Sequence, residues 1–423
     1  MTLDLDDRDQ ALLEGAEGRA MQLAMRTVAR AAGIMGATRL VPVTFAHIDA
    51  CFYAGKAHVD FAQFLFDHGA RFAVPVWTNS GLVSLANPEL RPEAGDVEAV
   101  AGARRLMALY QALGCRAVWT CAPYQLPGRP KAGDHIVVGE SNAVAFYNAV
   151  IGARTNKYGD YLDVACALTG KAPYAGLHTD EGRRGEMLFR LDNVPERLTR
   201  EDVFFHVLGH HVGRIAGRRI PVIDGLPRHA SEDHLKALSA ALAAAGGVEH
   251  WHGVGVTPEA PDVEAAFGGK APDEAHRVAL PDLEAARDAL STGRDGPLDM
   301  VALGTPHFSL GEFEALMPLI AGRKVRPGVA FYISTSRFVR ELASHRGWIG
   351  DLEQVGVEVI TDACTYYAPA VRGCRGRAMT NSAKWAYYAP GMLGIEVSFG
   401  SLEECVESAL RGEVWRDSDL WTP

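Results

Sequence analysis

The feature that most constrains the fold is an alternation of apolar and helix-like segments in the last third of the chain. The apolar runs LDMVALG (298–304), GVAFYIS (328–334) and GVEVITDAC (356–364) are separated by helix-like stretches over 309–322 and 336–348. Helical segments of this length between consecutive strands are typical of right-handed βαβ crossovers, which join parallel strands. The chain is therefore predicted to be an α/β protein built on parallel sheets.

Polar and sulfur-bearing side chains follow directly after several predicted strands. Ligands of open α/β sheets bind outside the carboxyl ends of strands, because loop N–H groups and helix N-termini converge there. Turns are polar in any protein, so one such residue alone indicates little. Two cysteines among them indicate more, because cysteine is usually buried. We therefore predict one site at this edge, with the candidate residues His47, Asp49, Asn79, Ser80, Cys121, His307, Ser309 and Cys364.

The length of the chain predicts more than one lobe. A chain of 423 residues is too long for a single compact core, so two or three α/β lobes are expected. An alanine-rich amphipathic pattern over 8–33 predicts an N-terminal helical segment, residues 1–40. A stretch rich in Gly and Pro, 255–276, is the best linker candidate. The predicted regions that follow the N-terminal segment are a first α/β region, 41–270, and a second, 271–423.

The charge and the cysteine content exclude several classes of protein. A formal net charge of −10 without a long basic run argues against nucleic-acid binding. The acidic N-terminus does not fit a signal peptide, and no segment approaches the roughly 18 uninterrupted apolar residues of a membrane span. We expect a cytoplasmic protein with neither a nucleic-acid nor a membrane partner. Seven cysteines, an odd number without an export signal, indicate thiols or metal ligands and not a disulfide framework.

Cys121 and Cys364 are the candidate metal ligands that the pattern favours. Each follows a predicted strand, so two thiols far apart in sequence can meet at one metal. The chain contains no C-x-x-C pair, which leaves a zinc ribbon or a thioredoxin-like site without support. No G-x-G-x-x-G follows a predicted strand, so a nucleotide site is weakly supported.

Five segments of the chain resemble, in order, the signature segments of the aconitase X family. They are AHIDACFYAG, TCAPYQLPGRPKAGDHIVVGESNAVAFYNAVIGARTNKYGD, GTPHFSLGEF, TDACTYYAP and MTNSAKWAYYAPG, between about residues 40 and 395. The resemblance implies an aconitase-like, multi-lobed α/β fold and an iron–sulfur dehydratase. One branch of the family dehydrates cis-3-hydroxy-L-proline, and an archaeal branch dehydrates mevalonate 5-phosphate.

The resemblance also implies a metal centre with one altered ligand. Cys121 and Cys364 match two cluster-ligating cysteines, whereas the third family cysteine is Thr305 here. The cluster therefore either has a different ligand and composition or is lost. Cys51 is the predicted replacement, because its segment touches substrate in the relatives, and Cys374 is the second choice. The expected cofactor is a 2Fe–2S or 4Fe–4S cluster, or mononuclear iron.

The chemistry of such a dehydration suggests roles for the remaining candidates. A poorly acidic proton leaves Cα and a hydroxyl leaves the neighbouring carbon, for which an iron with an open position is a suitable Lewis acid. The substrate carboxylate requires N–H donors and a cation. Other interpretations remain open: Arg154 as a structural ion pair, Lys384 as a solvent-facing residue, and the two histidines as core residues. The predicted substrate-binding residues are Ala50, Cys51, Phe52, Asn79, Ser80, Ser141, Asn142, Arg154 and Lys384. The predicted catalytic residues are His47, His307, Ser309 and Lys384.

We therefore expect the large subunit of a cis-3-hydroxy-L-proline dehydratase, with Δ1-pyrroline-2-carboxylate as product after tautomerisation of an enamine. The alternatives are a mevalonate 5-phosphate dehydratase large subunit, which a basic phosphate pocket would favour, and a non-catalytic or nucleotide-binding α/β subunit. Aconitase-type enzymes close their site with a swivelling domain that carries the catalytic serine. Neither end of this chain is expected to hold that domain, so a small swivelling subunit is the expected partner, and no proton-abstracting base is assigned here.

Overall fold

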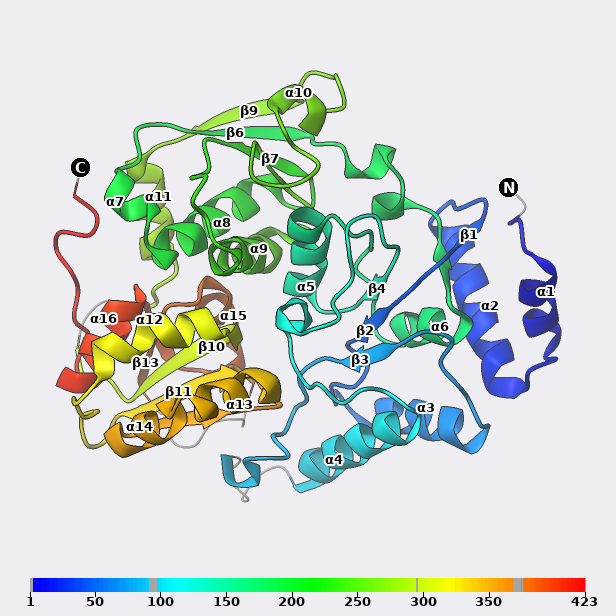
Figure 1. Ribbon diagram of the computed structural model, residues 1–423, viewed down its shortest axis with the longest axis horizontal. Coiled ribbons are helices and arrows are strands. Elements are labelled where there is room, and N and C mark those ends of the chain that lie inside the picture. The colour runs from blue at the N-terminus through cyan, green and yellow to red at the C-terminus, as the bar shows by residue number, and fades with distance from the viewer. Residues whose placement is uncertain (1–2, 91–96, 294–295, 368–373, 375, 423) are drawn as a thin grey trace.

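Three parallel sheets, a small antiparallel strand pair and the surrounding helices are the main elements of the described residues (Figure 1). The computed structural model describes residues 3–90, 97–293, 296–367, 374 and 376–422. Every strand pair within the three larger sheets is parallel. The predicted α/β fold with βαβ crossovers is thereby confirmed.

The N-terminal region contains a three-stranded sheet of order β3–β2–β4 and a small antiparallel pair, β1 and β5. The single helix expected over residues 8–33 is two helices, because Gly15 and Gly18 between them adopt φ values of +90° and +91°. Glycine reaches this left-handed region at little cost, and the chain turns there. The elements are α1 (Asp7–Glu14), α2 (Arg19–Ile34), β1 (Leu40–Pro42), β2 (Ala46–Ile48), α3 (Lys56–Asp67), β3 (Val76–Thr78), η1 (Pro88–Leu90), α4 (Val97–Ala112), η2 (Pro123–Gln125), β4 (Val137–Val138), α5 (Ser141–Phe146), η3 (Tyr147–Ile151), α6 (Leu162–Thr169), β5 (Lys171–Pro173), η4 (Gly176–His178) and η5 (Glu181–Arg183).

The middle region contains a four-stranded sheet of order β8–β7–β6–β9, with helices α8 and α9 beneath it in the view of Figure 1. The stretch 255–276 is not a linker: Phe267 within it is buried, and β9 at its end pairs with β6. The predicted boundary at residue 270 therefore falls inside this folded unit, because Gly and Pro also mark the turns between packed elements. The elements are β6 (Met187–Leu191), α7 (Glu196–Thr199), α8 (Asp202–Ala216), β7 (Pro221–Asp224), α9 (Glu232–Gly246), β8 (His252–Gly253), α10 (Val263–Ala266), β9 (Glu274–Val278) and α11 (Leu280–Ala289).

The C-terminal region is a five-stranded sheet of order β12–β11–β10–β13–β14, at the lower left of Figure 1. Its central strand β10 is buried along its whole length, as expected for a strand whose sheet is covered on both faces. The elements are β10 (Met300–Phe308), α12 (Leu310–Ile320), β11 (Ala330–Thr335), α13 (Arg337–His345), α14 (Trp348–Val355), β12 (Val357–Ile360), β13 (Arg377–Thr380), α15 (Ala383–Leu393), β14 (Glu396–Phe399) and α16 (Leu402–Arg411).

Strand β10 contains a bulge that the sequence did not predict. The strand was expected to end at Gly304, but it continues to Phe308 with a shift in register against β11. Leu303 pairs with Ile333 and Phe308 with Thr335, so residues 304–307 lie opposite a single residue of β11. A bulge leaves its extra residues outside the regular ladder and can re-aim their side chains. This bulge carries Thr305 and His307.

One buried cluster joins the three regions. It contains Phe146 from the first region, Phe204 from the second and Trp385 from the third, together with Cys121 and Cys364. The two predicted metal ligands therefore lie where the regions meet, inside the core of the molecule.

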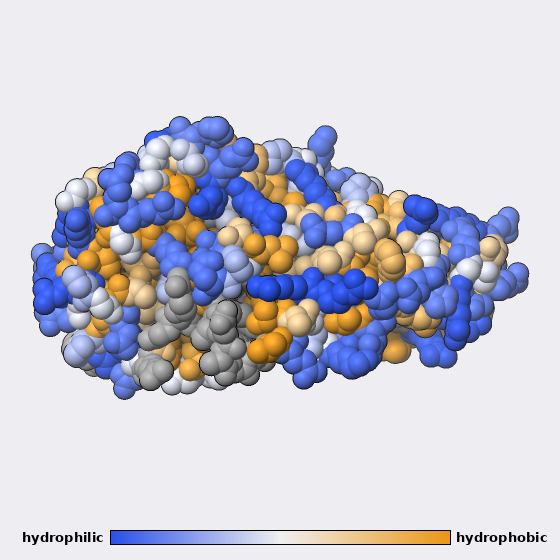
Figure 2. Space-filling model, turned by 90° about the horizontal axis from the view of Figure 1, so that it is seen from below, coloured by the Kyte–Doolittle hydropathy of each residue, from blue (hydrophilic) through white to orange (hydrophobic). Residues whose placement is uncertain are grey.

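Hydrophilic side chains cover much of the face seen in Figure 2, with apolar patches between them. No helix among the described residues is long and apolar enough to cross a membrane.

Candidate metal centre and active site

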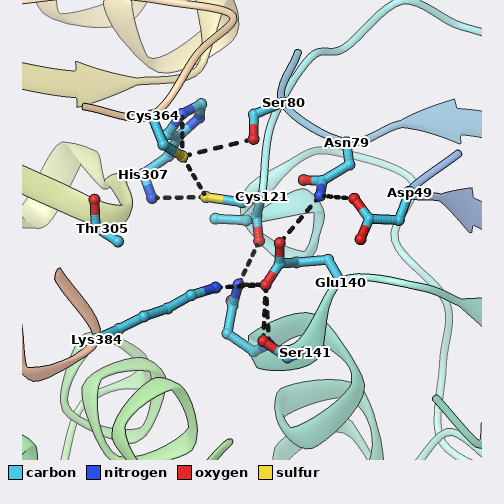
Figure 3. A network of polar contacts seen from close by, with 12 residues as sticks. Asp49, Asn79, Ser80, Cys121, Glu140, Ser141, Thr305, His307, Cys364 and Lys384 are labelled. Carbon is cyan, nitrogen blue, oxygen red and sulfur yellow. Dashed lines mark hydrogen bonds and ion pairs between the residues drawn. The ribbon is translucent and has the colours of Figure 1, made fainter. Parts of the chain in front are cut away.

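Two cysteines and one histidine form a compact group of possible metal ligands. One donor atom each from Cys121, His307 and Cys364 lies within 4.8 Å of the others, and all three residues are at most 1% exposed. The two sulfur atoms are 3.8 Å apart, and His307 Nε2 lies 3.8 Å from the Cys364 sulfur (Figure 3). Among the residues that the structure describes, no other such group of His, Cys, Asp and Glu is found.

The three ligand candidates come from different parts of the chain. Cys364 follows strand β12, as predicted. The segment before Cys121 is not a strand; Arg116 makes a single bridge to Trp77, and the chain then runs irregularly to the cysteine. His307 lies in the bulge of β10, where its N–H donates to the Cys121 sulfur at 3.3 Å. The bulge thus brings the backbone N–H of His307 into contact with Cys121 and its imidazole close to Cys364.

The imidazole of His307 is held on both nitrogens. Nδ1 lies 2.9 Å from the hydroxyl of Thr120, and Nε2 lies 3.3 Å from the carbonyl oxygen of Ala363. The hydroxyl of Thr305, two residues earlier in the bulge, is buried without a hydrogen-bond partner among the described residues. A polar atom of this kind is expected beside a group that the protein binds.

The surroundings of the two thiols differ. Burial raises the pKa of Cys121 above its ordinary value. Contact with Cys121 lowers the pKa of Cys364 in spite of burial, and the hydroxyl of Ser80, 3.5 Å from its sulfur, lowers it further. Cys364 is therefore the more readily ionised of the pair, and a thiolate is the form that binds a metal.

A buried network of charged and amide side chains lies beside the sulfur atoms (Figure 3). Lys384 Nζ donates to Glu140 Oε1 at 2.5 Å, and both side chains are almost fully buried. Asn79 donates through Nδ2 to Asp49 at 2.6 Å and to Glu140 at 3.0 Å. Asn142 donates to Glu140 at 2.9 Å and to the carbonyl of Cys121 at 3.1 Å, which connects the network to the thiols.

The pKa values of the two carboxylates diverge. Burial alone would raise the pKa of Glu140. The charge and hydrogen bond of Lys384, together with the hydrogen bonds of Asn79 and Asn142, instead bring this pKa below its ordinary value. Burial and the neighbouring Glu140 raise the pKa of Asp49 to about 7, against the lowering effect of Asn79. Glu140 is thus the fixed anion that neutralises Lys384, while Asp49 can hold or release a proton near neutral pH.

The orientation of the Asn79 amide follows from its partners. Its nitrogen lies between two carboxylate groups, which only accept when ionised, so the other amide atom is the oxygen. That oxygen is buried without a partner among the described residues and points toward the side where Cys364 and Ser80 lie (Figure 3). It is a free acceptor aimed at the centre of the site.

The predicted third ligand, Cys51, is not part of the metal group. Its sulfur contacts the carbonyl oxygens of Ile48 at 3.4 Å and Asn79 at 3.5 Å, and it belongs to the core of the first region. His307 takes that place in the group. Cys374, the second choice, is half-buried and lies outside the group as well.

The neighbours of Cys51 have structural partners. The N–H of Ala50 donates to Asp163 at 3.2 Å, and the ring of Phe52 packs against Tyr367 with centroids 4.5 Å apart. Ser141 donates to Glu140 at 3.1 Å, and Glu140 caps helix α5.

Three other predicted site residues lie in different surroundings. Ser309 caps helix α12, donating to Asp233 at 2.7 Å. Arg154 forms an ion pair with Asp180 at 2.5 Å, which is the structural interpretation left open from the sequence. His47 donates from Nε2 to the carbonyl of Thr120 at 2.9 Å, and burial lowers its pKa to about 4, so it is a neutral core histidine. The geometry gives none of these three a direct contact with the metal group.

The ligand atoms are buried and do not lie in an open cleft. A pocket of about 690 Å³ is lined by the loop after Cys121 and the start of helix α12, and none of the three ligand candidates is among its lining residues. Its lining includes Tyr124, whose hydroxyl donates to Asn142 at 2.7 Å, and Ser309.

Comparison with known proteins identifies the family. Sequence profiles of the first, second and third domains of aconitase X match residues 2–181, 185–288 and 298–411. The chain belongs to the aconitase X family. These ranges correspond to the three regions described above, each with its own parallel sheet.

Two kinds of relative match this aconitase X chain over almost its whole length. Proteins named cis-3-hydroxy-L-proline dehydratase, from Pseudomonas aeruginosa and Hypocrea jecorina, are 43% and 40% identical over 96% and 97% of the chain. The match covers 70% and 69% of those proteins. A phosphomevalonate dehydratase large subunit from Thermococcus kodakarensis is 32% identical over 96% of the chain and 99% of its own length.

A solved structure resembles the fold closely. The holo-form of Thermococcus kodakaraensis aconitase X has a TM-score of 0.85 and 30% identity, covering 96% of this chain and 100% of that one. The aconitase-like architecture expected from the sequence is therefore confirmed.

The donor set fits a soft or borderline metal ion. For a tetrahedral metal with metal–sulfur bonds of about 2.3 Å, two thiolates lie about 3.8 Å apart, which is the separation of Cys121 and Cys364. Thiolates and imidazole suit iron and iron–sulfur clusters, and a set of three protein ligands leaves a position for substrate. The unpartnered hydroxyl of Thr305 adds a polar group at the same place.

Sequence reasoning missed the central residue of the network. Glu140 received no role, although it directly precedes helix α5, which begins at Ser141. A carboxylate at a helix N-terminus is a recognisable signal, because it caps the helix and favours the N-terminal end of its dipole. Asp49 was noted at a strand end but was given no chemical role either.

Proposed function

We propose that this chain is the metal-bearing part of a hydro-lyase that removes water from cis-3-hydroxy-L-proline and yields Δ1-pyrroline-2-carboxylate. The observation that carries the proposal is the group of Cys121, His307 and Cys364 beside the network of half-buried Asp49 and buried Asn79 and Glu140. The names of the relatives at 43% and 40% identity support the same substrate.

The proposed cofactor is iron, as an iron–sulfur cluster or a mononuclear ion, held by Cys121, Cys364 and His307. When bound, the iron supplies a Lewis acid for the departing hydroxyl group. The hydroxyl of Thr120 accepts from Nδ1 of the imidazole, which leaves the lone pair of Nε2 for the iron, and Asn142 links the backbone of Cys121 to the carboxylate network. Outer contacts of this kind fix ligand orientation in metal sites.

The charges of the network fit a cyclic amino acid. Hydroxyproline carries a ring ammonium, a carboxylate and a neutral hydroxyl. The free acceptor of Asn79 and the carboxylate of Asp49 beside it can bind the ammonium N–H groups, because ammonium groups donate to such oxygens. Because its pKa is raised to about 7, Asp49 can exchange a proton with the ammonium group that it binds near neutral pH; it is not assigned to the Cα proton.

Mevalonate 5-phosphate is the second candidate substrate. Large subunits named for that reaction match this chain over nearly their whole length. A doubly charged phosphate, however, needs cations that are not already neutralised. Lys384 is the cation of the described network, and Glu140 neutralises it at 2.5 Å. This pairing favours hydroxyproline.

We further propose that the active enzyme includes a small swivelling domain from a second subunit. About 30% of the two dehydratases named for hydroxyproline lies outside the match, and the archaeal relatives are named as large subunits. No described residue of this chain is assigned as the base that removes the Cα proton. In aconitase-type enzymes that base belongs to the swivelling domain.

Anaerobic purification, iron and sulfide analysis, and a dehydration assay together test this function. The protein should contain iron, and with its small subunit it should consume cis-3-hydroxy-L-proline, with the product followed by NMR. The trans-3 and trans-4 isomers and mevalonate 5-phosphate serve as comparison substrates. Consumption of mevalonate 5-phosphate alone, or absence of metal from active protein, would contradict the proposal.

A further inference from the structure

Lys236 is a fully buried cation that the proposed reaction does not use. It lies on helix α9 of the middle region, with 2% of its side chain exposed. Burying an ammonium group costs several kcal/mol unless its charge and its N–H donors are matched. The partners of Lys236 therefore indicate what this residue does.

Three acceptors surround the ammonium group. Nζ donates to Glu312 Oε2, to Asp233 Oδ1 at 3.0 Å and to the backbone carbonyl of His307 at 3.4 Å. An ammonium has three donors, so all of them are used. Glu312 belongs to helix α12 of the third region, so the contact joins two regions of the molecule.

These residues form a closed ring through Ser309. The Ser309 hydroxyl donates to Asp233 at 2.7 Å, and the Ser309 N–H donates to Glu312 at 2.7 Å. Asp233 and Glu312 then both return to Lys236. The ring therefore holds the backbone by hydrogen bonds at the carbonyl of His307 and the N–H of Ser309.

The opposite side of His307 faces the metal group. Its N–H donates to the Cys121 sulfur, and its imidazole reaches Cys364. A shift of the carbonyl held by Lys236 would turn the peptide of the bulge and move both groups. Residues 304–307 have few ladder contacts of their own, since they lie opposite a single residue of β11. Outside support is thus needed to fix them.

We propose that Lys236 is a positioning residue of the metal centre, which holds the bulge of β10 so that His307 meets Cys121 and Cys364. The inference rests on the proposed metal centre but not on the identity of the substrate. It assigns helix α9 of the middle region a role at a site whose ligands all lie in the other two regions.

Iron binding by the anaerobic, metal-free protein tests this inference without an activity assay. Lys236→Met should weaken Fe²⁺ binding about 10- to 100-fold, the range typical for lost outer contacts of metal ligands. The absorption or EPR spectrum of the iron that does bind should change. Lys236→Arg keeps the charge and should recover part of the affinity. Lys171→Met is the matched control, because Lys171 also pairs with two carboxylates, Asp6 at 2.6 Å and Asp9 at 3.2 Å, outside this ring.

The outcomes separate the two proposals. Wild-type affinity and spectrum in Lys236→Met would overturn the role of Lys236, as would an equal loss in Lys171→Met. Failure of the wild-type protein to bind iron would instead contradict the metal centre. Circular dichroism of the metal-free variants reports folding. If Lys236→Met does not fold, the near-isosteric Glu312→Gln should show the same direction of change, and unaltered iron binding there would overturn the inference.

Discussion

At the scale of single residues, the identity of the third metal ligand is the sharpest point of difference between sequence and structure. Cys51 is the thiol that the family resemblance favoured, whereas His307 is the residue whose ring lies beside both sulfur atoms. We expect Cys51→Ala to retain iron, and His307→Ala and Cys121→Ala to lose most of it. Iron content per chain after anaerobic purification is the measurement. Loss of iron in Cys51→Ala with retention in His307→Ala would restore the prediction made from sequence.

The Lys384–Glu140 pair leads to a second expectation. Removing one partner of a buried ion pair leaves the other charge without compensation, at a cost of about 3–5 kcal/mol. Lys384→Met should therefore lower the free energy of unfolding by about that amount. The double variant Lys384→Met/Glu140→Gln should be less destabilised than Lys384→Met alone, because no buried charge is left unpaired.

Urea unfolding of the wild type, both single variants and the double variant completes the cycle. Additive effects of the two substitutions would mean that Lys384 and Glu140 do not stabilise each other. The solvent-facing position left open for Lys384 from the sequence is wrong, since the ammonium is buried and its only described carboxylate partner at this distance is Glu140.

At the scale of elements, the bulge of β10 depends on Gly304. This glycine has a φ of +86°, and a Cβ added to it would lie 2.0 Å from the carbonyl oxygen of Ser334 on β11. Gly304→Ala should therefore separate β10 from β11 and displace His307. We expect a loss of stability beyond the roughly 1–2 kcal/mol of left-handed strain, together with loss of iron.

Gly322 provides the control for that substitution. It has a φ of +68° but no neighbouring atom within 4 Å of an added Cβ. Gly322→Ala should show the backbone strain alone and keep its iron. Thermal unfolding and iron content of the two variants, measured side by side, separate strain from displacement. Equal effects in both would remove the argument for close approach at the bulge.

The loop after β2 provides a pH-dependent expectation. Asp163 accepts the N–H groups of Asp49 at 2.7 Å and Ala50 at 3.2 Å. Burial, with a contribution from Asp160, raises the pKa of Asp163 to about 8 from an ordinary value of 3.8. Between about pH 4 and pH 8 the folded state then holds a proton that the unfolded state has released. Stability should fall as the pH rises through this window, by up to about 1.4 kcal/mol per pH unit from this group.

Asp163→Asn removes this titration while keeping an oxygen acceptor for both N–H groups. The variant should therefore lose less stability than the wild type between pH 5 and pH 8, as urea unfolding at several pH values would measure. An identical pH dependence in both proteins would show that Asp163 is ionised throughout the range.

At the scale of the whole molecule, three sheets converge on one buried centre, and the ligand residues are closed off from solvent. The part of the Pseudomonas aeruginosa dehydratase outside the match, expressed separately, is a suitable stand-in for the proposed small subunit. Adding it to this chain should raise turnover of cis-3-hydroxy-L-proline at least tenfold over the chain alone. Full activity of the isolated chain would show that the base is local and contradict a two-subunit enzyme.

The parallel α/β architecture could be predicted from the sequence because strand and helix periodicities are local properties. The strands at 298–304, 328–334 and 356–364 were found in this way, and β10, β11 and β12 confirm them. The break between α1 and α2 and the folded segment 255–276 were missed. Glycine marks both a chain reversal and a flexible link, and only the packing around it distinguishes the two.

The residues of the site also separate into those that the sequence predicted and those that only the packing identified. The sequence by itself paired Cys121 with Cys364 and, through the family segments, identified an aconitase X chain, although only Cys364 follows a strand. Tertiary structure alone decided that His307 joins them, that Glu140 neutralises Lys384, and that Arg154 pairs with Asp180 elsewhere. The physical reason is that a strand end sets the edge where a residue lies. The bulges, the burial and the partners that set its direction and its charge come from residues far away in the chain.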